Sequence, residues 1–496
     1  MNDGLRTETG AAVLPAFAGF LRARWLPALA VSLLLLIPCF WHREIVATDL
    51  PSHLYNAWLV QLIRHGQAPG LWIAPQHTNV LFDWLLTGLG SIFRLQIAEK
   101  IAVSIAVLVF FWGAFALVSA VARRAPWFLT PVIALITYGW TFHLGFFNYY
   151  LSLGLSFFCL AIVWRGKRWE LLAALAIAPL VLAAHALGFF WLLAASAFVG
   201  FYENVRGWDK AVPFGLAVVA LLVLGFFLSR HYAALPASAP FYSFNGADQL
   251  VLFGRRYRFL ARALLLFATA SLVADMVRRR AGRDVWREYA IPFQLYVLAG
   301  LAVFLLPDAV VAPLPTAPVA LLTERLTSVS AVLGCCLLGV MRPSKWHLIG
   351  SAAIAAVFFA FLHQDTAVVN NMEAQIVQLV STLPPNQRVL ATILPLSRSR
   401  IFPQHIVDRA CIGRCFSYGN YEASTAQFRV RALPRNPYVL SDFELVVDAQ
   451  HGGYIVQPRD LPAYQIYQCS PSGTDLCITS LEAGEENDRL GEHPSQ

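Results

Sequence analysis

The segment TDLPSHLYNAWL, residues 48–59, holds the first cluster of polar and ionisable side chains after a long apolar run. If a helix begins just after Asp49, with Pro51 in its first turn, then Asp49, His53 and Asn56 lie on one face of it. A carboxylate at such a place can act as a general base towards a hydroxyl group, and His53 could share the proton or tune the carboxylate. The alternative is that Asp49 only caps the helix, because an Asp at this position often accepts free backbone N–H groups.

Other polar side chains interrupt apolar segments of the sequence at the ends of predicted membrane spans. A second interfacial helix is expected at 79–94 and carries Asp83. His143 and Asn148 lie in TFHLGFFNYY, and His185 lies in LAAHALGFF. A polar side chain inside a membrane costs free energy, so it is usually paired or functional. We expect these residues to line a cavity with Asn56, and hydrogen bonds between packed helices are the alternative.

Two groups of arginines are candidates for binding a phosphate. Arg325 lies in LLTERLTS, and Arg255 and Arg256 lie in LFGRRYRFL. The planar guanidinium group binds phosphate oxygens in pairs, which suits these sites to an anionic substrate. Each arginine could instead extend to the membrane surface as an interface anchor. Arg325 is the preferred phosphate-binding candidate.

The composition indicates a chain that crosses a membrane many times. Of 496 residues, 58% are hydrophobic and 13% are charged, whereas about a quarter are charged in typical globular proteins. Repeated apolar runs of a length that spans hydrocarbon predict helices, because helices satisfy their own backbone groups. Eleven spans are expected, near 26–42, 98–121, 127–142, 146–164, 170–185, 187–202, 211–229, 259–277, 290–306, 326–341 and 347–363. The region 170–202 could also be one broken helix, which would invert the orientation of everything after it.

The basic charge is explained by topology and not by a nucleic-acid partner. The net charge is +8, and the positive residues gather in short clusters between alternate pairs of spans. This pattern is typical of cytoplasmic loops. Residues 1–25 are therefore expected in the cytoplasm, 26–363 as the membrane domain, and the long loop 43–97 outside. No small-residue cleavage site follows the first apolar run, so 26–42 is expected to remain as a span.

Beyond residue 364 the long apolar runs end, and a small extracytoplasmic α/β domain is expected over 364–483. VVNNMEAQIVQLVSTL has helical periodicity, and RVLATIL and FELVVDA resemble strands. Residues 484–496 are expected to be disordered. Four cysteines fall in this region, Cys411, Cys415, Cys469 and Cys477. Two disulfides are favoured over a zinc site, with the pairing left open.

The order of these features resembles the GT-C superfamily of polytopic membrane glycosyltransferases, in particular its bacterial mannosyltransferase-like members. A single span leads into an outside loop with an acidic residue near its start, then two interfacial helices, then the next span. The resemblance implies a sugar donor linked to polyprenyl phosphate, a bacterial inner membrane location, and Asp49 as the catalytic acidic residue. It implies neither the sugar nor the acceptor, and no metal ligand is assigned, although a divalent metal is possible. The chain has one Asp at 48–50 where a paired acidic motif would be expected.

Two other functions stay open. A lipid or solute transporter or flippase would need ionisable residues near mid-span or a nucleotide-binding motif, and the sequence lacks a GxxxxGK[ST] motif. A catalytically inactive relative of the GT-C enzymes would bind lipid or a partner without chemistry. Replacement of Asp49 separates this possibility from a transferase.

Overall fold

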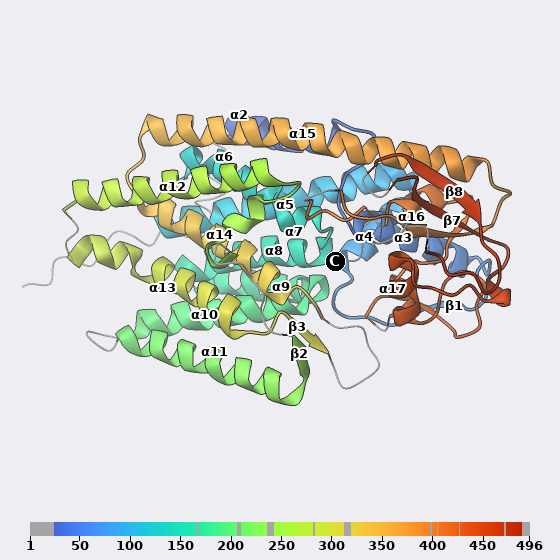
Figure 1. The fold of residues 1–496 in the computed structure, drawn as a ribbon. Helices are drawn as coiled ribbons and strands as arrows, with labels where there is room; N and C mark the ends of the chain where they lie inside the picture. Colours follow the sequence, from blue (N-terminus) through green and yellow to red (C-terminus); the bar gives the residue numbers. More distant parts are fainter. Residues whose placement is uncertain are drawn as a thin grey trace, which may run out of the picture.

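A computed structural model describes residues 24–165, 168–205, 210–235, 243–280, 283–311, 319–396, 399–403, 405–425, 427–470 and 473–488. The predicted N-terminal segment 1–25 lies almost entirely outside these residues. The predicted disordered tail 484–496 lies outside them from 489 onward, but its first residues are ordered, because Asn487 is buried and donates to the carbonyl of Ala449 at 2.7 Å. A bundle of long helices is joined at one end to a smaller domain formed by the C-terminal part of the chain (Figure 1).

Eight helices are long and apolar enough to cross a membrane, which agrees with the expected α-rich polytopic class. They are α5 (Leu95–Ala122), α8 (Phe147–Arg165), α10 (Ala186–Asn204), α11 (Ala211–His231), α12 (Arg255–Arg278), α13 (Arg283–Leu305), α14 (Leu322–Val340) and α15 (Lys345–Ser381). Two shorter apolar helices, α2 (Trp25–Phe40) and α9 (Arg168–Ala184), occupy the first and fifth predicted spans.

The third predicted span, 127–142, is not one continuous helix, and the structure does not confirm it as a span. The segment is divided into η1 (Trp127–Leu129), α6 (Thr130–Thr137) and α7 (Trp140–His143). Gly139 interrupts the helix with an extended backbone conformation, φ −81° and ψ −170°. None of the three pieces approaches the roughly 20 residues that a helix needs to cross hydrocarbon.

The region 170–202 forms a helical hairpin that turns at His185. Ser152 of α8 donates to the carbonyl of Val181 in α9, and Cys159 donates to that of Ala174, so α8 and α9 run antiparallel. Ser152 also donates to the carbonyl of His185, while Ser156 donates to that of Gly188, so α10 runs parallel to α8. Two antiparallel helices favour two spans over one broken helix.

The first loop contains both predicted helices, and neither is a simple surface helix. They are α3 (Leu50–Arg64) and α4 (Leu81–Gly90), with the short strand β1 (Leu71–Ile73) between them. Asp49 occupies the N-cap position of α3 but makes no side-chain cap hydrogen bond, which removes the main support for a capping role. The residues from Leu50 to Ala57 are all buried. The polar face of α3, which carries His53 and Asn56, therefore packs against other parts of the protein.

The C-terminal domain has a four-stranded sheet in the order β5-β4-β7-β8. Strand β4 (Arg388–Thr392) pairs parallel with β5 (Phe416–Ser417) and β7 (Ala463–Gln468), and β8 (Leu476–Ser480) pairs antiparallel with β7. The predicted strand RVLATIL corresponds to β4. The predicted strand FELVVDA is wrong, because these residues form helix α17 (Phe443–His451), capped by Asp442 at its start and by Gly452 at its end.

The remaining short elements connect the bundle and the domain. They are β2 (Ala233–Leu235), η3 (Ser243–Asn245), η4 (Ala247–Leu250), β3 (Ala309–Val311), α16 (Ile406–Cys411), η5 (Glu422–Ser424), β6 (Val430–Ala432) and η6 (Pro458–Asp460). Strand β1 of the first loop pairs antiparallel with β6 of the C-terminal domain. The first loop and the domain thus share one small sheet.

The C-terminal domain is also fixed to the bundle by a buried arginine. Arg409 of α16 donates from Nη1 to both oxygens of Glu373 at 2.6 and 2.8 Å, and from Nη2 to Glu99 at 2.9 Å. Glu99 belongs to α5, and Glu373 to the part of α15 that extends beyond the bundle alongside the domain (Figure 1). Two disulfides, Cys411–Cys415 and Cys469–Cys477, confirm the expected number of bridges.

Candidate functional site

Asp49 is placed by backbone contacts with the turn after α7. The N–H of Thr48 donates to the carbonyl of His143 at 2.8 Å, and the N–H of Asp49 donates to that of Leu144 at 3.1 Å. The His143 ring contacts the Val46 carbonyl through Nδ1, also at 2.8 Å. His143 therefore supports the backbone of the Asp49 segment, and its Nδ1 is occupied by this contact.

Gly145 permits this close approach. Its φ is +82°, and a Cβ atom at this position would lie 2.6 Å from the Asp49 nitrogen. Such a distance is shorter than contact radii allow, and the positive φ itself is strained for residues with a side chain. The glycine of HLGFF is thus required for the position of Asp49.

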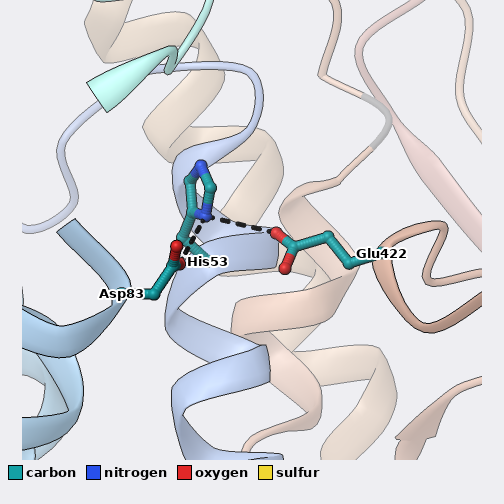
Figure 2. A group of neighbouring side chains, drawn as sticks. All are labelled: His53, Asp83 and Glu422. Atoms are coloured by element: carbon teal, nitrogen blue, oxygen red, sulfur yellow. Dashed lines mark hydrogen bonds and ion pairs between the residues drawn. The ribbon is translucent and has the colours of Figure 1, made fainter. Parts of the chain in front are cut away.

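His53 lies between two buried carboxylates (Figure 2). Its Nδ1 atom is 3.0 Å from Oδ1 of Asp83 and 3.3 Å from Oε1 of Glu422, while Nε2 points away from both. Asp83 comes from α4 and Glu422 from the C-terminal domain, so three separate segments meet at one ring. This arrangement fixes the orientation of the imidazole.

Asn148 positions Asp83. It donates from Nδ2 to Oδ2 of Asp83 at 2.9 Å and accepts the backbone N–H of Phe82 at 2.7 Å. One amide side chain therefore fixes both the carboxylate and the start of α4. Of the polar residues predicted to line a cavity, Asp83 and Asn148 are in direct contact with each other.

The ionisation of this group follows from burial and mutual attraction. Burial alone would lower the pKa of His53, but Glu422 and Asp83 outweigh it and raise that pKa to about 10. Burial raises the pKa of Glu422 to about 8, although His53 acts against it. The pKa of Asp83 is lowered, because the interaction with His53 and the hydrogen bonds from His53 and Asn148 outweigh its burial. His53 is thus an imidazolium at neutral pH, which favours tuning of Asp49 over a role as a base.

Asp49 lies beside this group and is reached by side chains of the C-terminal domain. Its side chain keeps 15% of its surface exposed, and Oδ1 lies 3.9 Å from Nε2 of His405. Burial raises the pKa of Asp49 to about 6, although His53, Arg325 and a hydrogen bond from Tyr421 act in the opposite direction. A carboxylate with this pKa is largely ionised at pH 7 and still basic enough to accept a proton.

Asn56 lies one turn after Ser52 on α3, and its contacts are structural. Its Nδ2 donates to the Ser52 carbonyl at 2.9 Å and to Oδ1 of Asn420 at 3.1 Å. Asn420 in turn donates to Ser52 Oγ and to Asp408. Asn56 therefore binds the C-terminal domain through a buried polar network.

Arg325 and His185 form a second polar group at the same end of the bundle. Nη1 of Arg325 lies 3.0 Å from Nε2 of His185, and the N–H of Leu187 donates to Nδ1 of the same ring at 3.1 Å. The guanidinium also lies over the ring of Phe146 at 4.1 Å. Asp49 and Arg325 are close enough for each charge to stabilise the other.

The arginines before α12 are placed differently. Arg256 forms an ion pair with Asp365 of α15 and lies over the ring of Phe361 at 4.4 Å. Arg255 is exposed at the start of α12. Neither has a contact with Asp49 or His53 among the described residues, so their predicted role in substrate binding gains no support from geometry.

The C-terminal domain contributes site residues that the sequence did not predict. They are His405, Asp408, Asn420, Tyr421 and Glu422. They fall in HIVDRACIGRCFSYGNYEAS, residues 405–424, a stretch that holds several ionisable and hydrogen-bonding side chains. These side chains were the available signal, but no spacing within the stretch indicates contact with α3, more than 340 residues earlier.

The side chains of His53, Asp83 and Glu422 are also of the types that bind divalent metals, and their ligand atoms lie within 4.8 Å of one another. No metal ligand was predicted from the sequence. The alternative of a zinc site at the four C-terminal cysteines does not hold, because all four are in disulfides.

Comparison with known proteins gives no family for this chain. No family model matches it, no curated protein matches it, and no solved structure matches it. The function must therefore be argued from the site.

Proposed function

We propose that this protein is a membrane glycosyltransferase that moves a sugar from a polyprenyl-phosphate-linked donor to an acceptor hydroxyl at the periplasmic face. The single observation that carries the proposal is the pair of hydrogen-bond donors at Arg325 and His185, beside a carboxylate with a raised pKa. A transferase of this kind needs both parts, a base for the acceptor and a cationic site for the leaving phosphate.

The N–H donors around the His185 ring outnumber the acceptor atoms that the ring offers. A neutral imidazole has one acceptor nitrogen, and the N–H of Leu187 already donates to Nδ1. Nε2 then carries a proton and faces another donor, Nη1 of Arg325, at 3.0 Å. An anionic oxygen bound between these two N–H groups would accept from both.

Arg325 has unused capacity for the same anion. Its Nε atom is buried and has no hydrogen-bond partner among the described residues. No carboxylate of those residues lies within 4.0 Å of its guanidinium. A buried cation without a direct counter-ion is costly, so a phosphate group would supply the missing negative charge.

The chemistry follows from these positions. The acceptor oxygen attacks the anomeric carbon of the sugar, and its proton passes to the carboxylate of Asp49. The bond between the anomeric carbon and the phosphate oxygen breaks, and the negative charge that develops on the phosphate is stabilised by Arg325 and His185. The positive charge of His53 keeps Asp49 ionised before the reaction.

The test is binding of polyprenyl phosphate to the full-length protein in lipid nanodiscs. We expect Arg325→Gln to weaken binding at least tenfold, because charge-assisted hydrogen bonds contribute about 1.5–3 kcal/mol. Arg230→Gln is the matched control, since Arg230 is an exposed arginine at the end of α11. Equal affinity of wild type and Arg325→Gln would contradict the proposal. A panel of polyprenyl-phosphate sugars, assayed for release of the lipid phosphate, then identifies the donor.

A further inference from the structure

We propose that His53, Asp83 and Glu422 bind one divalent transition-metal ion, with Zn²⁺ as the favoured species. The inference concerns ion binding and does not depend on sugar transfer. It assigns Asp83 and Glu422 a role that the transferase proposal does not give them, and His53 a second role beside its effect on Asp49.

The first observation is the spacing of the three ligand atoms. Nδ1 of His53, Oδ1 of Asp83 and Oε1 of Glu422 all lie within 4.8 Å of one another, and the two distances to Nδ1 are 3.0 and 3.3 Å. A tetrahedral ion with ligand bonds of about 2.0–2.2 Å has neighbouring ligand atoms about 3.3–3.6 Å apart. The two distances to Nδ1 are therefore within a few tenths of an ångström of this spacing, and the two carboxylate oxygens lie no more than 4.8 Å apart. Figure 2 shows both carboxylates directed at the same ring nitrogen.

The second observation is the local balance of charge. Asp83 and Glu422 are buried, with 9% and 2% of their surface exposed. Within the described part of the chain, no Lys or Arg side chain lies within 4.0 Å of either carboxylate; His53 contacts both, and Arg429 acts on Asp83 from a greater distance. A divalent cation bound by all three side chains would hold both acidic groups as carboxylates and neutralise their charges, which removes the cost of burying those charges.

The ligands are also held in place by neighbours outside the group. Asn148 donates to Oδ2 of Asp83, whereas His53 contacts Oδ1 of the same carboxylate, and Ser52 donates to Oε1 of Glu422 at 3.1 Å. Hydrogen bonds of this kind orient carboxylate ligands in metal sites. His53, Asp83 and Glu422 come from α3, α4 and η5, so a bound ion would join the first loop to the C-terminal domain.

The ligand set indicates the class of metal. One imidazole nitrogen and two carboxylate oxygens suit Zn²⁺ and, less tightly, Mn²⁺, whereas Ca²⁺ and Mg²⁺ favour oxygen alone. Binding requires that Nδ1 of His53 and any protonated Glu422 carboxyl group release their protons to the solvent, so the ion replaces these protons of the metal-free protein.

The test uses untagged full-length protein in nanodiscs, freed of metal by a chelator and titrated with Zn²⁺ by calorimetry. We expect one equivalent to bind, and Co²⁺ in its place to give the visible absorption of a low-symmetry site. Glu422→Gln preserves the shape of the side chain but removes the anionic ligand, and it should weaken Zn²⁺ binding more than tenfold. Glu444→Gln, an exposed glutamate on α17 of the same domain, should bind as wild type does.

Thermal unfolding provides the second measurement. Zn²⁺ should raise the unfolding temperature of the wild type and of Glu444→Gln, but not that of Glu422→Gln or Asp83→Asn. Two ligand variants guard against the chance that one of them fails to fold. The proposal is overturned if folded wild-type protein takes up no stoichiometric ion, or if folded Glu422→Gln or Asp83→Asn binds Zn²⁺ as tightly as wild type. Since neither measurement requires turnover, failure here leaves the transferase proposal intact.

Discussion

Arg409 allows the coupling between the C-terminal domain and the bundle to be tested quantitatively. Its guanidinium makes three hydrogen bonds of 2.6–2.9 Å to carboxylates of Glu373 and Glu99 and a fourth, of 3.2 Å, to the carbonyl of Ile45. Glu44 lies 3.7 Å from Nε. Replacement by Met keeps most of the apolar stem but leaves buried carboxylates without their cation. Loss of one partner of a buried ion pair costs about 3–5 kcal/mol.

Hydrogen exchange of the α16 amides measures this cost directly. A loss of 3–5 kcal/mol corresponds to a decrease in protection of roughly two to four orders of magnitude in Arg409→Met. Arg414→Met is the matched control, because Arg414 lies on the same domain but donates to backbone carbonyls near the surface, among them that of Val380 at 3.1 Å. We expect its effect to be below about 1 kcal/mol.

A double variant separates the ion pair from general damage. In Arg409→Met with Glu373→Gln, one of the unpaired carboxylates is removed, so part of the protection should return, by about 1–3 kcal/mol relative to additivity. The reasoning is refuted if Arg409→Met changes protection less than Arg414→Met does, or if the two substitutions are additive.

Four further outcomes follow from the site. Gly145→Ala should lower turnover more than tenfold, because its Cβ would collide with the Asp49 nitrogen, whereas Gly66→Ala, with φ +69° and no atom within 4 Å of its Cβ, should leave turnover unchanged. Burial raises the pKa of Asp49 to about 6, so turnover should rise tenfold per unit below pH 6 and level off above it, and a flat pH–rate profile would disprove the role of Asp49 as base. The same raised pKa means that folding stability from this group falls as pH rises from about 4 to 6, and Asp49→Asn should abolish that fall in thermal unfolding. Asn148→Ala should cost about 1–3 kcal/mol in thermal unfolding because the buried N–H of Phe82 loses its acceptor, and no change would show that water replaces the amide.

Local sequence patterns were sufficient for the features that depend on neighbouring residues. The apolar runs predicted the long helices, and Pro51 with the polar spacing at Asp49 and His53 predicted α3. The pattern failed at FELVVDA, because a short apolar run fits a strand or a helix, and the caps at Asp442 and Gly452 decided the outcome.

Only part of the candidate site could be predicted from the sequence. Asp49 and His53 are close in sequence, and Asp83 follows on the next helix of the same loop, so a local argument reaches them. Glu422 belongs to another domain and meets His53 only because α3, α4 and η5 pack together. No periodicity encodes a contact over that separation, which is why the second carboxylate at His53 and the hydrogen bond from Tyr421 to Asp49 were missed.

The central claim, that Asp49 is the base of a transferase using a lipid-phosphate donor, is tested most directly by one measurement. The release of polyprenyl phosphate from its glycosylated form is followed at pH 7.5 in the presence of acceptor, for wild type and for Asp49→Asn of equal stability. The account predicts release by the wild type and a loss of at least two orders of magnitude in the variant, since proton transfer by a positioned base contributes about 10²–10⁴-fold. Equal rates in the two proteins would contradict it.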